Sequence, residues 1–204
     1  MNAATAEARS PAARPRPAQA DTNDTAGARR IAAAFSAALA ADRTALIPYV
    51  VAGYPTYDDS FAAACAAIDA GADLLEIGLP YSDPLADGAT LQRASHAALL
   101  NGATLDRSLA LVARVVAARP TVPIVTMGYA NQLIGGGDGR DRATALAVAG
   151  AAGVIVADLT PDEGAPFEAV AAASGLPSSI SSHRRPRRIA CAPSPAGAGD
   201  SCTA

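Results

Sequence analysis

The sequence has no lysine and no tryptophan, and its 16 strongly basic residues are all arginine. Histidine is nearly absent, with only His96 and His183, and the three cysteines lie far apart without CxxC or His/Cys spacing. These absences argue against a disulfide framework, a zinc site and a histidine-rich metal centre. Missing lysine beside abundant arginine, alanine, glycine and proline is typical of a gene with a very high G+C content.

Long hydrophobic runs and a strong charge of either sign are also lacking. No apolar run approaches the roughly 18 residues of a membrane span, and the first residues lack the apolar core of a signal peptide. A net charge of −3 and an isoelectric point near 5.3 provide no attraction to nucleic acid or to an anionic membrane. We therefore expect a cytoplasmic protein that binds neither nucleic acid nor membrane.

Both ends of the chain are poor in large apolar side chains. Residues 1–26 are mostly Ala, Pro, Arg and Thr, so they cannot bury enough apolar surface to offset the entropy of ordering. Residues 177–204 hold four Arg, six Ser and four Pro but only two large aliphatics, Ile180 and Ile189, without a strand or helix period. We therefore expect one folded domain over residues 27–176 between two disordered tails.

Within that domain, compact apolar runs alternate with stretches of helical spacing. Four apolar runs without polar alternation predict buried parallel strands. Thr56 and Thr104 are predicted helix N-caps, and the Gly-rich residues 128–139 are predicted to form a flexible loop. The expected strands are 46–51, 74–78, 122–127 and 153–158, and the expected helices are 27–41, 56–70, 90–100, 104–118, 140–150 and 162–174.

The repeat of strand then helix is the pattern of a parallel α/β fold whose sheet is covered by helices. No GxGxxG motif follows any strand, which argues against dinucleotide binding, and the regular alternation favours a (β/α) barrel over an open Rossmann sheet. A complete TIM barrel has eight β/α units in about 250 residues. We therefore expect the α/β class and the TIM (β/α)8 barrel family, with only about the first four units present.

Two acidic residues stand at the expected end of the second strand. Glu76 lies between Leu75 and Ile77, where partial desolvation would raise its carboxyl pKa towards the range of a general acid or base. Asp87 follows in a loop with Asp83. Functional groups of (β/α) barrels gather at the C-terminal ends of the strands, so this pair is a candidate acid/base site. The residues alone equally allow Glu76 to pair with an arginine and Asp87 to be an ordinary turn residue.

Two tyrosines and one further acid approach the same rim. Tyr49 lies within the first expected strand, Tyr129 follows the third, and Asp158 ends the fourth. By residue type and position alone, the tyrosines are as readily explained by packing in the core or at the rim, and Asp158 by capping of the next turn. These three residues are therefore candidates with an open alternative.

Four stretches together carry a resemblance to a known family. They read LIPYVVAGYP, GADLLEIGLPYSDPLADGATLQRA, MGYAN and GVIVADLTPDE, and they follow the order found in the tryptophan synthase alpha subunit. The resemblance covers residues 30–176 and is most specific around Glu76. Departures are confined to loops: Gln132 stands for the usual proline, the GGGDG run is looser, and Thr160 interrupts the usual Asp-Leu-Pro.

The resemblance implies a lyase of tryptophan biosynthesis that cleaves indole-3-glycerol phosphate into indole and glyceraldehyde 3-phosphate. Glu76 then matches the catalytic acid/base that protonates the indole carbon, and Asp87 matches the acid that stabilises charge at the indole NH. No metal or cofactor is implied, since pyridoxal phosphate belongs to the beta subunit, the expected partner in an alpha2-beta2 heterotetramer. Positions that line the indole pocket or its rim correspond to Tyr49, Leu91, Met127, Tyr129 and Ile155.

The family's sequence is expected to stop after Leu176. Reading each later codon one base earlier can spell VVYLVAPTTPP and RGFVY, which resemble the family's fifth strand, its loop and its sixth strand, so we expect a reading-frame shift there. The family's glycine-rich phosphate-binding loops come later still. These expectations imply that residues 177–204 are non-homologous and that this chain lacks lyase activity. The alternative is a non-catalytic fragment that binds the beta subunit.

Overall fold

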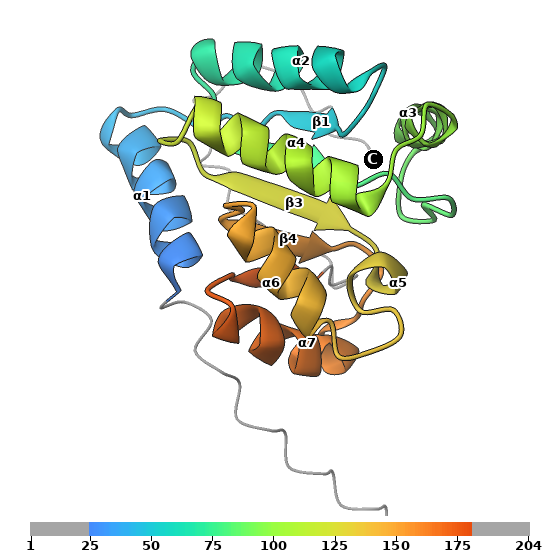
Figure 1. The fold of residues 1–204 in the computed structure, drawn as a ribbon. Helices are drawn as coiled ribbons and strands as arrows, with labels where there is room; N and C mark the ends of the chain where they lie inside the picture. The colour runs from blue at the N-terminus through green and yellow to red at the C-terminus, as the bar shows by residue number, and fades with distance from the viewer. Residues whose placement is uncertain (1–24, 181–204) are drawn as a thin grey trace, which may run out of the picture.

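A computed structural model describes residues 25–180, and the expectations for residues 1–24 and 181–204 lie outside this range. Helices and strands alternate along the chain as the sequence predicts (Figure 1). The strands are β1 (Tyr49–Val51), β2 (Leu75–Gly78), β3 (Ile124–Gly128), β4 (Gly153–Val156) and β5 (Ser178–Ile180). The helices are α1 (Ala26–Ala40), α2 (Tyr57–Asp69), α3 (Ala89–Leu100), α4 (Leu105–Ala118), α5 (Ala130–Leu133), α6 (Arg140–Val148) and α7 (Pro161–Ala173). Over residues 25–180, no helix is long and apolar enough to cross a membrane.

All five strands form one parallel sheet whose spatial order equals the chain order, β1-β2-β3-β4-β5. Each new strand is therefore added at the same edge, as in a barrel, whereas an open doubly wound sheet reverses direction at a switch point. The expected fold class is confirmed. The described residues form four complete β/α units followed by a fifth strand, which together make a partial TIM barrel.

Helices α2, α4, α6 and α7 cover one face of the sheet (Figure 1). Strand residues that point to this face are fully buried, because apolar side chains of the helices pack over them. They include Leu75, Ile77, Ile124, Val154 and Val156. The main apolar core therefore lies between the sheet and its outer helices, which explains why the strands read as continuous apolar runs.

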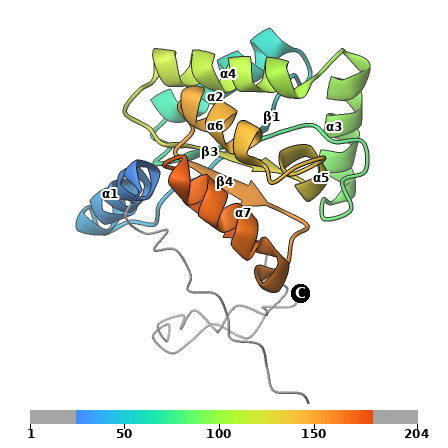
Figure 2. The same cartoon turned by 60° about the horizontal axis from the view of Figure 1, so that its bottom comes forward.

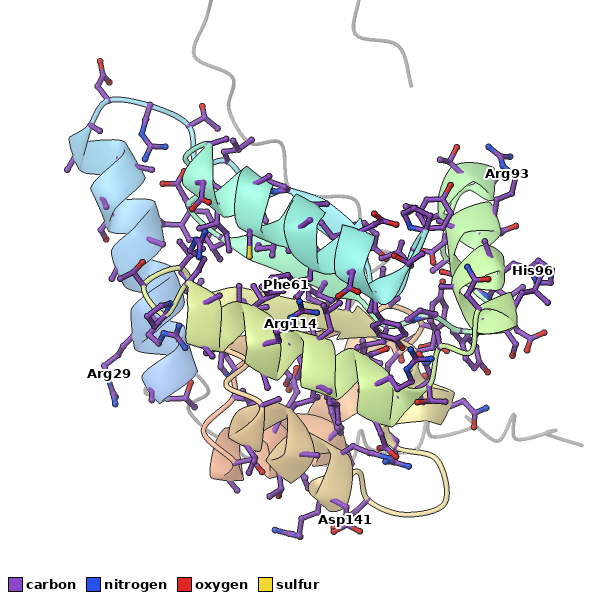
Figure 3. All side chains as sticks on the ribbon, turned by 45° about the horizontal axis from the view of Figure 1, so that its top comes forward. Arg29, Phe61, Arg93, His96, Arg114 and Asp141 are labelled. Atoms are coloured by element: carbon purple, nitrogen blue, oxygen red, sulfur yellow. The ribbon has the colours of Figure 1, made fainter. Side chains whose placement is uncertain are left out.

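Arginine side chains join the outer helices α2 and α4. The Arg114 guanidinium lies 3.9 Å from the centre of the Phe61 ring, and Arg107 lies 4.1 Å from the centre of the Tyr57 ring. Figure 3 shows Arg114 beside Phe61. Each contact places a cation over an aromatic face and covers apolar surface with a long side chain. The two helices are thus held together on their solvent side as well as through the core.

Helix α1 lies at the N-terminal ends of the strands (Figures 1 and 2). Its buried Gly27 donates a backbone hydrogen bond to the Gly175 carbonyl at 3.3 Å. The Arg30 guanidinium donates to the carbonyl oxygens of Pro120 and Gly150, at 3.2 and 3.4 Å. These contacts tie α1 to the segments that lead into β3, β4 and β5.

Two helix starts are confirmed, and several other predicted boundaries are wrong. The fourth strand ends at Val156, so Asp158 lies in the turn after it and does not end the strand. Thr56 and Thr104 each accept a backbone N–H at the start of α2 and α4. Strand β1 begins three residues later than predicted, because Pro48 has no N–H with which to extend the ladder. Residues 128–139 are not all loop, since α5 forms a helical turn within them.

The prediction that no strand follows Leu176 is also wrong. Strand β5 pairs in parallel with β4, with Ser178 in register with Val154. Its two serines produce no apolar run, so the strand has no local signal in the sequence. Its position follows from the open edge of β4, which offers hydrogen-bonding groups to the next segment of chain.

Replacing Gly27 by alanine should destabilise the fold, although alanine is the better helix former. The new Cβ would lie 2.0 Å from the Ala152 carbonyl oxygen, a backbone atom that cannot rotate away. We expect the free energy of unfolding to fall by about 1–3 kcal/mol, measured by urea denaturation with circular dichroism.

Gly88→Ser is the matched control for this substitution. A Cβ at Gly88 meets no atom within 4 Å, and serine is a preferred N-cap at the start of α3. The control should be as stable as the parent chain or slightly more so. Equal stability of the two variants would contradict the close packing of α1 against the start of β4.

Candidate active site on the concave face

The predicted site residues lie on the sheet face opposite the outer helices. Residues in register on parallel strands point the same way, so Tyr49, Glu76 and Val125 form one row across β1, β2 and β3. A second row, two residues further along each strand, consists of Val51, Gly78, Met127 and Ile155. We call these two rows the concave face. Most of its side chains are half-buried, whereas the residues between them are fully buried against the helices.

Gly78 leaves the space that the Tyr49 side chain occupies on the concave face. A Cβ at Gly78 would fall 1.8 Å from the Tyr49 hydroxyl oxygen and 2.5 Å from the ring carbon that bears it. The Tyr49 side chain therefore extends from the first row over the second, towards the C-terminal ends of the strands. The glycine in the IGLP motif is needed because this close approach leaves no room for a side chain.

The loop after β2 brings Asp87 to Tyr129. The backbone N–H of Ala86 donates to the Tyr129 hydroxyl oxygen at 3.1 Å, and the hydroxyl donates to the Asp87 carboxylate. Tyr129 is only 2% exposed and stands directly after β3, so its ring has little freedom to move. One buried hydroxyl thus joins the β2 loop to the end of β3 and holds Asp87 at the rim of the concave face.

Glu76 lies close enough to Asp87 for the charge of Asp87 to shift its pKa. Burial raises the pKa of the Glu76 carboxyl, and the negative charge of Asp87 raises it further. Burial also raises the pKa of Asp87, while the hydrogen bond from Tyr129 opposes that increase. Both carboxyls are therefore biased towards holding a proton, with Tyr129 opposing this bias at Asp87, and a raised pKa is what a general acid near neutral pH needs.

The carboxylates also affect the pKa values of both tyrosines of the site. Burial, followed by the charge of Asp87, raises the pKa of Tyr129 to about 12. Burial, followed by the charges of Asp87 and Glu76, also raises the pKa of Tyr49. The two hydroxyls consequently stay protonated at neutral pH. The structure brings together four of the five polar residues that the sequence places at this rim, namely Tyr49, Glu76, Asp87 and Tyr129.

Side chains that the sequence analysis did not assign to the site fix the loops around it. The Tyr81 ring stacks on Tyr129 with centroids 5.0 Å apart, and the Asn131 amide donates to the Tyr81 hydroxyl at 3.1 Å. The Gln132 amide, at the position where proline is expected, donates to the Pro80 carbonyl at 2.7 Å. The β2 and β3 loops are therefore linked by stacking and by two hydrogen bonds.

The remaining candidates lie around this arrangement. Asp158 accepts the backbone N–H of Ala130 at 2.7 Å, so it joins the end of β4 to the start of α5 in the β3 loop, whereas capping of the turn that follows Asp158 was the expected alternative. Leu91 of α3 packs with Val51 and Tyr49 in a second apolar cluster at the β1 side of the face. Met127 and Ile155 are in register on β3 and β4. The five predicted pocket residues thus lie on the concave face, beside it or at its rim, and their roles stay predictions.

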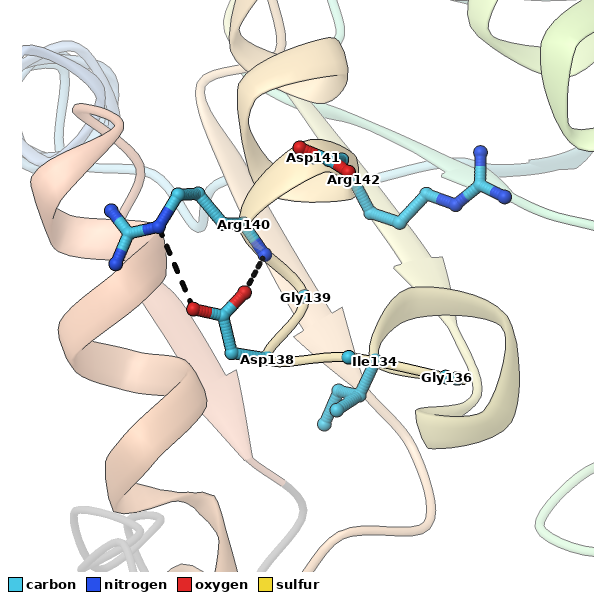
Figure 4. Close-up of a pocket in the computed structure, with 9 residues that line it drawn as sticks. Ile134, Gly136, Asp138, Gly139, Arg140, Asp141 and Arg142 are labelled. Carbon is cyan, nitrogen blue, oxygen red and sulfur yellow. Dashed lines mark hydrogen bonds and ion pairs between the residues drawn. The ribbon is translucent and has the colours of Figure 1, made fainter.

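A separate hollow lies under the glycine-rich loop, away from the acid pair. It has a volume of about 290 Å³ and is lined by residues 134–142 (Figure 4). Asp138 accepts the backbone N–H of Arg140 at 2.9 Å and forms an ion pair with its side chain at 3.5 Å. The charges of Asp138 and Arg140 are thus paired with each other within the loop. Within residues 25–180, no group of three or more His, Cys, Asp or Glu side chains is placed to hold a metal ion.

Carboxylates and tyrosines on one sheet face and in the loops that follow the strands, within a partial (β/α) barrel, form an arrangement typical of barrel enzymes. A family model described as tryptophan synthase alpha chain matches residues 35–180. The chain belongs to the tryptophan synthase alpha chain family. The match runs through β5, four residues beyond the predicted end at Leu176.

Relatives and solved structures agree with this assignment. The chain is 48% identical over 147 residues to the tryptophan synthase alpha chain of Roseiflexus castenholzii. The aligned region covers 72% of this chain and 56% of that protein. Identity to the alpha chain of Gluconacetobacter diazotrophicus is also 48%, over 72% of this chain and 53% of the relative.

Among solved structures, the alpha subunit from Legionella pneumophila superposes with a TM-score of 0.69 at 33% identity, covering 73% of this chain and 56% of that one. A tryptophan synthase structure from M. tuberculosis superposes with a TM-score of 0.69 at 37% identity. The superposition covers 74% of this chain and 60% of that chain. The chain thus spans little more than half the length of its relatives.

Replacing Glu76 by glutamine should raise stability at neutral pH but not in acid. Because the folded-state pKa of Glu76 is raised, ionisation is disfavoured in the folded protein. Stability should therefore fall as the pH rises from the unfolded pKa of about 4.3 through the raised folded pKa. Glutamine removes this loss, so the melting temperature of E76Q should exceed the parent's by a few degrees near neutral pH and match it below about pH 4.

Glu168→Gln, on the outer helix α7 and not on the concave face, is the control for the loss of one acid from the chain. Its effect on the melting temperature should not grow between acid and neutral pH as that of E76Q does. A variant E76Q that is equally destabilised at both pH values would contradict the burial of Glu76 on the concave face.

Replacing Tyr129 by phenylalanine should loosen the β2 loop while leaving the stacked ring in place. The change removes the acceptor for the Ala86 N–H and the donor to Asp87. Loss of a hydrogen bond worth about 1 kcal/mol corresponds to roughly fivefold faster hydrogen exchange at the Ala86 amide, observable by NMR. Tyr81→Phe, which loses only the bond from Asn131, should leave the Ala86 amide protected. Unchanged exchange in Tyr129→Phe would contradict the link.

Proposed function

We propose that the concave face is the indole end of a tryptophan synthase alpha-type lyase site. The reaction would cleave indole-3-glycerol phosphate to indole and glyceraldehyde 3-phosphate in tryptophan biosynthesis. The observation that carries this proposal is the convergence of Glu76 and Asp87, with burial and Asp87 both raising the pKa of Glu76. Membership of the family provides the substrate class.

Glu76 would act as the acid towards the indole carbon that bears the glycerol chain. Its raised pKa favours the protonated form that this step requires. Protonation of that carbon allows the bond to the glycerol chain to break, with the electron pair returning to the ring. The adjacent hydroxyl of the chain loses its proton and becomes the aldehyde, so one proton gained by the ring is balanced by one lost from the chain.

Asp87 would stabilise the positive charge that develops at the indole nitrogen when the ring is protonated. The hydrogen bond from Tyr129 favours the ionised form of this carboxyl against the effect of burial, and it fixes the direction of the carboxylate. Leu91 and Tyr49 on one side, and Met127 and Ile155 on the other, are apolar walls of a kind that suits a flat aromatic ring. Together these residues would orient the ring between the two acids.

The described residues offer no comparable binding site for the phosphate end of the substrate. TIM barrels bind phosphate through loops after the seventh and eighth strands and through a nearby helix N-terminus. The described residues end with the fifth strand. We therefore infer that the 204-residue chain lacks lyase activity, because substrate would not be held against the acid pair.

Indole release from indole-3-glycerol phosphate tests this inference. The purified 204-residue chain should produce indole no faster than buffer alone, while the alpha chain of Roseiflexus castenholzii serves as the positive control. Indole release that disappears in Glu76→Gln would overturn the inactivity and support the role of Glu76. Indole release that persists in Glu76→Gln would overturn both the inferred inactivity and the proposed role of Glu76.

The second candidate function is a non-catalytic fragment that binds the beta subunit of tryptophan synthase. The observation that favours it is that Tyr81, Asn131 and Gln132 order the rim loops through contacts within the described residues. Adding the chain to a beta subunit should then change serine-dependent tryptophan formation from indole. The change should be the same for Glu76→Gln, since docking needs no acid, and the absence of any change would rule this candidate out.

We also infer that the family's reading frame is lost close to Ile180, where the family match ends. The nucleotide sequence across codons 170–204 and beyond tests this. Family sequence in the adjacent frame would support the inference, and its absence there would contradict it.

A further inference from the structure

Strands β1 and β5 form the two open edges of the described sheet. The carbonyl of Pro48 and the N–H of Ala52 bond towards β2. Because successive residues of a strand direct their backbone groups to opposite sides, the N–H groups of Tyr49 and Val51 point away from β2. At the other edge, the Pro177 carbonyl accepts from Val154, so the backbone groups of Ser178 point away from β4.

The two edges are complementary to each other. All five strands run in the same direction, so β5 of one copy can continue the parallel ladder onto β1 of another. A two-fold axis perpendicular to the strands would instead pair β1 with β1 and β5 with β5 in antiparallel contacts. A two-fold axis that runs along the strands keeps every contact parallel, like the ladders within the sheet.

Apolar side chains are exposed where β1 would be covered. Leu46 and Ile47, which lead into this strand, are 52% and 42% exposed, and Tyr54, which follows it, is 44% exposed. The concave face beside them is apolar apart from Glu76 and Tyr49, and its Met127 and Ile155 side chains are half-buried. An apolar edge next to an apolar face is typical of a surface that another protein covers.

Other parts of the printed chain do not offer the side chains needed to cover this surface. Residues 1–24 contain one large apolar residue, Met1, and residues 181–204 contain one, Ile189. A net charge of only −3 opposes self-association weakly. The complementary edges and the apolar face both point to a second copy of this chain as the occupant.

We propose that two copies of this chain close into one parallel barrel, with β5 of each copy paired to β1 of the other. Five strands from each copy would then leave no open edge, and the two concave faces would enclose the barrel interior. This proposal does not depend on the lyase function. It assigns the edge of β1, the segment that leads into it and the edge of β5 as the dimer interface.

Light scattering after size exclusion tests the proposal with the complete 204-residue chain. The expected mass is about 40 kDa, twice the 20.2 kDa of one chain. Ile47→Arg places a charge beside β1, and Ser178→Pro removes an N–H that faces the open edge and is not part of the β4–β5 ladder. Each variant should elute as a monomer. Val148→Arg, at an exposed apolar position of the outer helix α6, should stay dimeric.

Mixing the two edge variants provides the sharper outcome. A heterodimer of Ile47→Arg and Ser178→Pro has one seam with both changes and one seam with neither, so dimer should reappear on mixing although neither variant forms it alone. Circular dichroism of each variant shows whether it is folded before mixing. A monomeric parent chain, an open-ended series of larger oligomers, or a dimer that both edge variants retain would each overturn the proposal.

Discussion

The register of the parallel ladder is the constraint on which the rest of this structure depends. It places Tyr49 beside Glu76 and Met127 beside Ile155, so that residues from separate β/α units share the concave face. The residues between them face the helices and form the core that holds the strands in register. Site and core are therefore alternate positions of the same strands. A slip of one residue in any strand would exchange the two faces.

Placing carboxyl groups on a half-buried sheet face costs free energy, and the surrounding contacts offset only part of it. Tyr129 donates to Asp87, and the Ala86 N–H fixes the same hydroxyl from the other side. Glu76 responds to burial and to Asp87 by holding its proton more firmly. Such arrangements are typical of sites where reactivity is kept at the expense of stability. This feature links the geometry of the rim to the acid/base role proposed for Glu76.

Much of the fold could be predicted from the sequence, because apolar runs, caps and glycines are local signals. The caps Thr56 and Thr104 and the strand that carries Glu76 are of this kind. Which residues share a face could not be predicted, since buried parallel strands show no polar alternation. The strand at Ser178 has no apolar run and is defined by its pairing with β4. The stacking of Tyr81 on Tyr129 joins loops that are far apart in sequence, so only the fold reveals it.

The central claim is that Glu76 and Asp87 meet on a partly buried face of this half barrel. The most direct test is an NMR titration of the Glu76 side-chain carboxyl in the 204-residue chain and in Asp87→Asn. The account predicts a Glu76 pKa above its ordinary value in the parent chain, and a lower one when the charge of Asp87 is removed. An ordinary Glu76 pKa that Asp87→Asn leaves unchanged would contradict it.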